Sequence, residues 1–313
     1  MNCLETTQRS RIDQALAAQL ELLSGGVSGA STYRVHGLPE SRVLKIIEAE
    51  SADDVRTRGY REIHFYDALA ARVPLRTPRV FASLIDTSGY CALLIAAYEP
   101  MKAASELRAD DYIEIARQLA GFHAVYWNRT EQLSVFSWLP QPMTLDLTND
   151  VQHAHESWQL LAKQPQFQDI LTKSTLHAIE AALTDVITTP AYDPATAMTL
   201  CHGDCHLDNL LYEQEGGLVW ADWQEVRIGY GPNDLTFLIQ RAEAQGATIA
   251  HDLIIAAYCN ALKSSGVESV KEETITAAIN ESERRTRLLY WPDYMRDATT
   301  ESMLYHLTRI FPG

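Results

Sequence analysis

The chain has 313 residues, 46% of them hydrophobic, and a formal net charge of −15. This length and composition predict a folded protein with two lobes or domains and exclude a largely disordered chain. The acidic charge argues against nucleic acid as a partner, and the lack of a long apolar run or a signal peptide argues against a membrane and for the cytoplasm.

The acidic charge is concentrated in the second part of the chain. Residues 1–100 carry 11 Lys and Arg against 12 Asp and Glu, whereas residues 101–313 carry 15 against 29. Such a field would concentrate a cationic substrate. Acidic helix surfaces that only keep the protein soluble would give the same distribution, so both explanations stay open.

The five cysteines are odd in number and widely scattered, which favours a reducing compartment over a disulfide framework. Cys201 and Cys205 lie close together in the sequence, but no second pair of ligands is nearby. A structural zinc site is therefore not expected.

The first hundred residues predict a small β-sheet accompanied by two helices. Apolar residues at helical spacing predict one helix over residues 4–23 and another from about 53 to 71. Between and after them, alternating apolar residues and turn sequences predict strands at 33–36, 43–47, 80–85 and 91–96. A glycine-rich stretch at residues 25–32 interrupts the pattern before the first strand.

From about residue 108 onward the pattern is mostly helical. Helices are expected near residues 112–122, 150–163, 168–187, 234–244, 251–265 and 272–290. Only two short strands are expected among them, at residues 210–213 and 218–222, joined by a Glu-Gly-Gly turn. The sequence therefore predicts an α+β fold, with a small β-rich lobe at residues 1–98 and a large, mainly helical lobe at residues 99–313.

The most informative motif is His202-Gly203-Asp204, followed by Asn209 and, after the predicted hairpin, by Asp222. Phosphoryl transfer from ATP needs these residue types in this order. One carboxylate accepts the proton of the attacking hydroxyl, and an amide and a second carboxylate hold Mg²⁺. Because a chance His-x-Asp-x₄-Asn is rarely followed at hairpin distance by a strand that ends in Asp, the motif predicts a kinase.

This motif resembles the aminoglycoside phosphotransferase branch of the protein-kinase-like superfamily, which has HGD-x₄-N where protein kinases have HRD-x₄-N. The sequence Asp222-Trp223-Gln224, in place of DFG, is similar to that of the ecdysteroid-kinase-like members. The resemblance implies a two-lobed protein-kinase-like fold, Asp204 as the catalytic base, and Asn209 and Asp222 as Mg²⁺ ligands. It also implies a hydroxyl-bearing small molecule as acceptor, such as an aminoglycoside, an amino-alcohol or a sugar, and a monomer or homodimer.

The amino-terminal part supplies candidates for binding the phosphates. Lys45 is the only lysine in the first hundred residues, and it lies in an apolar strand where an unpaired charge would be costly. Residues 61–66 resemble the family's REx₃Y segment, so Glu62 is expected to hold Lys45. The glycine-rich stretch is expected to cover the phosphates of the nucleotide. Its candidate cofactor-binding residues are Gly26, Ser28, Gly29 and Ser31.

Four further assignments complete the expected site. The adenine-binding hinge is expected at residues 93–98, where two alanines replace the acidic pair that is frequent in the family. His123 is expected to be a buried structural residue, and Asp234 to brace the catalytic loop from a helix N-terminus. The acceptor is expected on the carboxyl-terminal helices. Its candidate residues form two groups: Asp146, Asp150, His153, Glu156 and Trp158, and Arg287, Tyr290, Trp291, Asp293 and Tyr294.

Two other classes of protein were compared with the small-molecule kinase. A nucleotide-binding regulator that has lost turnover usually lacks the base or a metal ligand, whereas this chain has both. A protein kinase would have an Ala-Pro-Glu segment and a longer interval between Asp222 and Asp234. The sequence therefore predicts an enzyme, with the regulator as the alternative.

Overall fold

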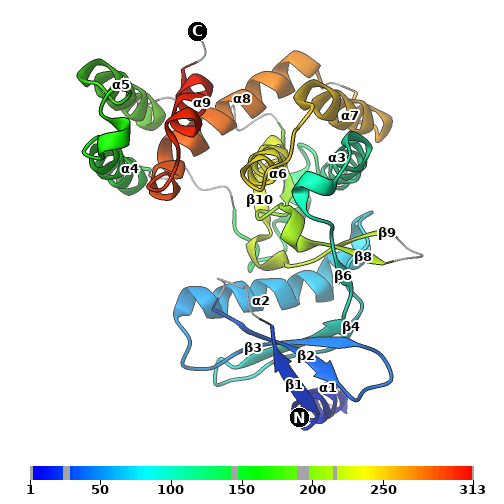
Figure 1. Cartoon of the computed structure of the whole chain (residues 1–313). Coiled ribbons are helices and arrows are strands. Elements are labelled where there is room, and N and C mark those ends of the chain that lie inside the picture. The colour runs from blue at the N-terminus through cyan, green and yellow to red at the C-terminus, as the bar shows by residue number, and fades with distance from the viewer. Residues whose placement is uncertain are drawn as a thin grey trace.

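The computed structural model describes residues 3–23, 29–141, 147–188, 197–213, 217–268 and 270–311. Figure 1 shows a small lobe built on a β-sheet and a larger lobe of helices, with α2 (Asp53–Ala68) lying between the sheet and the larger lobe. The predicted two-lobed, protein-kinase-like fold is confirmed in this architecture. The boundary between residues 98 and 99 stays a prediction.

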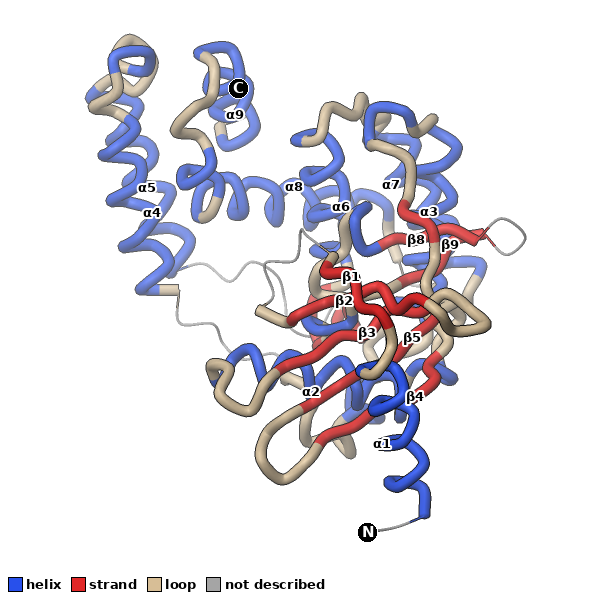
Figure 2. Tube along the Cα trace, turned by 60° about the horizontal axis from the view of Figure 1, so that its bottom comes forward, coloured by secondary structure: helices blue, strands red, loops and turns tan. Residues whose placement is uncertain are grey.

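The sheet of the small lobe has five antiparallel strands in the order β1-β2-β3-β5-β4. They are β1 (Gln19–Leu22), β2 (Ser31–His36), β3 (Arg42–Ile47), β4 (Val80–Ile85) and β5 (Cys91–Ala96). Figure 2 shows these strands side by side, with α2 passing behind them.

The two faces of this sheet are covered by different helices. Alternate residues of a strand point to opposite faces: Leu94 of β5 packs in a cluster with Ile12 of α1 (Cys3–Leu16), and Leu93 packs in a cluster with Ile63 of α2. Because β5 is covered on both sides, its run of buried residues is continuous rather than alternating. Lys45 lies opposite Leu93 in the register, so its side chain starts on the face that α2 covers.

The prediction of a helix over residues 4–23 is wrong in its second half. The helix α1 ends at Leu16, and residues 19–22 form β1, which pairs with residues 33–36 of β2. Leu16 and Leu20 have helical spacing, but the ladder to β2 satisfies the backbone groups of this segment. That pairing is a tertiary contact which the local pattern does not contain.

The larger lobe consists mainly of helices around two hydrophobic cores. Its helices are α3 (Ala109–Ala124), α4 (Thr148–Leu161), α5 (Lys173–Thr188), α6 (Pro232–Ala244), α7 (His251–Ser264), α8 (Glu272–Leu289) and α9 (Thr300–Ile310). One core joins α2, α3, α6, α7 and the first part of α8, and the other joins α4, α5, α9 and the end of α8. None of the helices in the described ranges is long and apolar enough to cross a membrane.

Short strands carry the motif region, and the sequence predicts only some of them. The hairpin of β8 (Leu210–Glu213) and β9 (Gly217–Trp220) confirms the predicted pair, with β6 (Glu99–Pro100) on its edge. The strands β7 (Met198–Cys201) and β10 (Arg227–Tyr230), which pair with each other, were not predicted, and neither was α9. All four of these strands have only four residues, but β8 and β9 were marked by the predicted Glu-Gly-Gly turn between them, whereas β7 and β10 are far apart in the sequence and share no such turn.

Candidate active site

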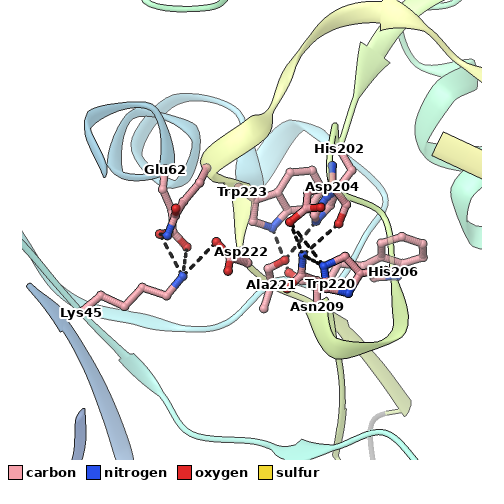
Figure 3. Close-up of polar contacts among 11 residues, drawn as sticks. Lys45, Glu62, His202, Asp204, His206, Asn209, Trp220, Ala221, Asp222 and Trp223 are labelled. Atoms are coloured by element: carbon pink, nitrogen blue, oxygen red, sulfur yellow. Dashed lines mark hydrogen bonds and ion pairs between the residues drawn. The ribbon is translucent and has the colours of Figure 1, made fainter. Parts of the chain in front are cut away.

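Lys45 connects the small lobe to the motif region. Its Nζ donates hydrogen bonds to both carboxylate oxygens of Glu62, at 2.8 and 3.0 Å, and to Oδ1 of Asp222 at 3.2 Å. Figure 3 shows the lysine reaching from the sheet to Glu62 on one side and to Asp222 on the other. The structure therefore brings the predicted pair together and places Asp222 beside it.

Burial and neighbouring charges have opposite effects on the pKa values of Lys45 and Glu62. Burial alone would lower the pKa of Lys45, but the charges of Asp222 and Glu62 outweigh it and raise the pKa. Burial raises the pKa of Glu62, and the neighbouring ammonium group partly offsets that effect. Lys45 is therefore a fixed cation in a protected position between two carboxylates.

Asp204 lies in a loop between β7 and β8, beside Asn209. Nδ2 of Asn209 donates to the backbone oxygen of Asp204 at 2.8 Å and to its Oδ2 at 3.1 Å. Nε2 of His206 lies 3.4 Å from the same Oδ2. Burial alone would raise the pKa of Asp204, but the contacts with His206 and Asn209 outweigh it and hold the pKa below its usual value. The carboxylate is thus ionised at neutral pH and able to accept a proton.

The oxygens of Asn209 and Asp222 suit a divalent cation. The amide nitrogen of Asn209 is used by Asp204, and its Oδ1 accepts no hydrogen bond from the described residues. Asp222 uses Oδ1 for Lys45, and its other carboxylate oxygen likewise has no donor within the described ranges. Carboxylate and amide oxygens are the ligands that Mg²⁺ prefers. Asp222 also has a left-handed backbone, with φ of 62°, which is uncommon for a residue other than glycine and clusters at functional sites.

One buried carboxylate fixes the start of the catalytic loop. Oδ2 of Asp234 accepts from the backbone N–H of His202 at 2.6 Å, and Oδ1 accepts from the N–H of Gly203 at 3.0 Å. His123, which is fully buried, lies 3.2 Å from the same carboxylate and 2.7 Å from the hydroxyl of Tyr258. The structural role that the sequence assigns to His123 and the bracing role of Asp234 agree with these contacts. The carboxylate turns to the loop and does not cap its own helix, α6.

His202 contacts the segment that carries Asp222. Its Nε2 lies 3.0 Å from the backbone oxygen of Ala221, directly before Asp222, and its ring lies 4.5 Å from that of Trp223. Burial lowers the pKa of His202, so the ring is neutral in this position. A buried imidazole thus links the loop of Asp204 to the segment that carries Asp222.

Position 203 requires glycine, both for its backbone conformation and for the space around it. Its φ is +85°, and a Cβ built on it would lie 2.0 Å from the backbone oxygen of Glu225. We expect Gly203→Ala to lower stability by more than the roughly 1–2 kcal/mol of a left-handed alanine and to displace the loop of Asp204. Thermal unfolding of this variant is compared with that of Gly246→Ala, where φ is +89° but no atom lies within 4 Å of the added Cβ. Equal melting temperatures for the two variants would contradict the close approach.

The other predicted cofactor-binding residues are only partly described. Gly26 and Ser28 lie outside the described residues. Gly29 has φ of +78° and lies against Val55 of α2, and Ser31 begins β2 opposite Ile46. At the hinge, the N–H groups of Ala96 and Ala97 donate to backbone oxygens of the small lobe, at Arg79 and Ser41. The assignment of these residues to nucleotide binding stays a prediction.

The two groups of acceptor candidates meet in space. On α4, Nε2 of His153 lies 2.8 Å from Oδ2 of Asp293, and Asp150 accepts from the hydroxyl of Tyr290 at 3.3 Å. Other members are structural: Trp158 is buried in the second core, and Arg287 pairs with Glu283 at 2.8 Å in the interior. Asp146 lies outside the described residues.

Sequence reasoning missed several residues around the site. His206 was not among the candidate site residues, but its Nε2 lies 3.4 Å from Oδ2 of the predicted base, Asp204. Gln224, whose Nε2 lies 3.5 Å from Glu62, and Glu225, which pairs with two arginines of α2, were not singled out. The partners of Gln224 and Glu225 lie more than 160 positions away in the sequence, so no local pattern marks these two residues.

The two cysteines near the site are buried. Burial raises the pKa of the thiols of Cys201 and Cys205, which opposes the thiolate form that a zinc site needs.

A lysine–glutamate pair under a five-stranded sheet, facing a loop with an aspartate and an asparagine, defines a phosphotransferase of protein-kinase-like fold. The chain belongs to the phosphotransferase enzyme family, whose model matches residues 19–270. No curated protein sequence matches the chain.

Solved structures agree with this fold. The chain is similar to the GDP complex of an aminoglycoside 2′-phosphotransferase-IIIa, with a TM-score of 0.62, 16% identity and coverage of 97% of this chain and 96% of that one. A putative aminoglycoside phosphotransferase from Ralstonia eutropha gives a TM-score of 0.59 at 13% identity, covering 98% and 94%. The apoenzyme of a macrolide 2′-phosphotransferase from Brachybacterium faecium gives 0.54 at 16% identity, covering 98% and 99%. At these identities the likeness establishes the fold alone.

Proposed function

We propose that the protein transfers the γ-phosphoryl group of ATP to a hydroxyl group of a small molecule, with Mg²⁺ as cofactor. The observation that carries this proposal is the chain of contacts from Glu62 through Lys45 to Asp222, beside the pair of Asp204 and Asn209. These are the positively charged, metal-binding and proton-accepting groups that phosphoryl transfer needs. The family supports the same class of reaction.

Each residue of the site has a defined part in this reaction. Lys45, held by Glu62, binds phosphate oxygens of ATP. Asn209 and Asp222 hold Mg²⁺, which neutralises charge on the phosphates when bound. Asp204 accepts the proton of the acceptor hydroxyl. The oxygen of that hydroxyl forms a bond to the γ-phosphorus of ATP while the bond between this phosphorus and the leaving ADP breaks. His206 and Asn209 keep this carboxylate ionised and oriented.

The acceptor belongs to the helical lobe in this proposal. Candidates are an antibiotic such as an aminoglycoside, an amino-alcohol, a sugar or another metabolite. The exposed carboxylates and tyrosines where α4 meets the end of α8 would suit a cationic group. Two of the structural neighbours are complexes with kanamycin and with gentamicin, which makes aminoglycosides a sensible start for a screen.

The proposal is tested by measuring Mg²⁺-dependent consumption of ATP and of GTP across a panel of aminoglycosides, macrolides, amines, sugars and simple alcohols. We expect at least one acceptor to raise nucleotide consumption well above the rate in its absence, and the phosphorylated product to be 80 Da heavier. Calorimetry with ADP and Mg²⁺ is run in parallel. Nucleotide binding without turnover on any acceptor would favour the non-catalytic regulator, and absence of both would contradict the proposal.

A further inference from the structure

We propose that Glu225 is a positioning residue, which holds α2 and its Glu62 in the orientation for phosphoryl transfer. The inference rests on the proposed function above. Nε of Arg58 lies 2.8 Å from Oε1 of Glu225, and Nη1 of Arg61 lies 3.1 Å from Oε2. The two arginines are one turn apart on α2, so they reach the same carboxylate from one face of the helix.

The same segment touches the catalytic loop through its backbone. Glu225 lies three residues after Asp222, and its carbonyl oxygen occupies the space beside Gly203 that a side chain would need. Nη1 of Arg61 also donates to the backbone oxygen of Gln224 at 2.8 Å. Glu225 therefore contacts α2 with its side chain and the loop of Asp204 with its main chain.

Movement of α2 would change both contacts of the helix together. Glu62 follows Arg61 directly, so a shift that separates Arg61 from Glu225 also moves Glu62 away from Lys45. The ring of Phe65, on the same helix, stacks on Trp223 with centroids 3.9 Å apart and planes 11° apart. This apolar contact holds α2 near the lobe when the ion pairs are removed, so variants of Glu225 fold while the orientation of α2 is relaxed.

The negative charge in this arrangement comes from a carboxylate of the chain itself. Negative charge next to a helix of kinase-like enzymes can be supplied by a phosphate group added after synthesis. Here the charge is part of the chain and is held by two guanidinium groups. Only eleven residues separate Asp222 from Asp234, and Glu225 lies within this short connection.

The test uses the whole protein with Glu225→Gln, which keeps the size of the side chain and removes its charge. We expect kcat for nucleotide consumption to fall about 10-fold, since small misplacements of catalytic groups have large effects on rate. KM for the acceptor should stay near wild type, because the proposed acceptor site lies where α4 meets the end of α8 and not on α2. Hydrogen–deuterium exchange of residues 53–68 should become faster, and Glu225→Asp, which keeps the charge, should recover part of both effects.

Arg56→Ala is the matched control on the same helix. Arg56 bonds to the backbone oxygens of Ala49 and Ser51 and to Asp53, all within the small lobe, so kcat should not change. Arg58→Ala should lower kcat as Glu225→Gln does. The double variant Arg58→Ala/Glu225→Gln should have a kcat no lower than that of Glu225→Gln alone.

Wild-type kcat and wild-type exchange of α2 in Glu225→Gln would overturn the inference. An equal fall in kcat for Arg56→Ala would do the same, because it would trace the effect to α2 in general. If the wild-type protein consumes no nucleotide with any acceptor, the proposed function fails, whereas exchange of α2 still decides whether Glu225 holds the helix.

Discussion

Replacing Asp204 by Asn is expected to lower kcat by about 10²–10⁴, the usual contribution of a general base, while affinity for ADP with Mg²⁺ stays near wild type. The amide keeps an oxygen that can accept from Asn209, so the loop retains its shape. It has lost the basic oxygen that takes the acceptor's proton. Single-turnover consumption of ATP and calorimetry with ADP measure the two quantities separately.

Asp208→Asn is the control for this experiment. Asp208 lies in the same loop, but its side chain is 63% exposed, and its partners are Gln245 at 3.3 Å, His206 at 3.4 Å and Arg241 at 3.9 Å. It should keep wild-type kcat. If Asp204→Asn also kept wild-type kcat, another group would be the base, and His206 would be examined next because its Nε2 lies 3.4 Å from Oδ2 of Asp204.

Among the substitutions proposed for this protein, Asp234→Ala is expected to lower the thermal stability most. The substitution leaves two backbone N–H groups and His123 without their shared acceptor in the interior. Removing one partner of a buried charged pair costs about 3–5 kcal/mol. At roughly 2–4 °C per kcal/mol for a protein of this size, thermal unfolding should occur on the order of 10 °C lower.

Asn233→Ala provides the comparison, since Asn233 lies in the same turn of α6 and its side chain makes no hydrogen bond within the described residues. Its melting temperature should stay within 2 °C or so of wild type, as is usual for sites without such contacts. The Asp234→Ala variant should also lose turnover, because the backbone of the catalytic loop loses its anchor. A stable and fully active Asp234→Ala variant would contradict the bracing role.

Much of the geometry of the candidate site could be predicted because its residues are constrained by local chemistry. Lys45 is a single lysine in an apolar strand, and such a charge requires a partner, which Glu62 provides. Asp204 and Asn209 are separated by a fixed spacing on one loop, so their contact follows from the sequence. The strands at 80–85 and 91–96 were predicted with the bounds that the structure has, since each is a six-residue apolar run between clear turns.

The predictions that were wrong or missing have one physical origin: these segments and residues depend on partners that are distant in the sequence. Residues 19–22 look helical by spacing, and only the ladder to β2 makes them a strand. The strands β7 and β10 exist because they pair with each other across about 30 residues. Glu225 looks like an ordinary acidic residue until α2 brings two arginines to it. Pairings of this kind are selected by the folded state and leave no periodic trace in the sequence.

The two separate cores of the larger lobe have a consequence for how the protein can change. The loop of Asp204 and the segment of Asp222 rest on the core shared by α2, α3, α6 and α7, whereas α4, α5 and α9 pack in the second core. Because α8 contributes to both cores, substitutions on α4, α5 and α9, rather than on α8, should reshape the second core and leave the first intact. In evolutionary terms the helices proposed to receive the acceptor form an exchangeable part. A new acceptor specificity could arise there by replacing α4 and α5 as a unit, with the phosphoryl-transfer machinery inherited unchanged.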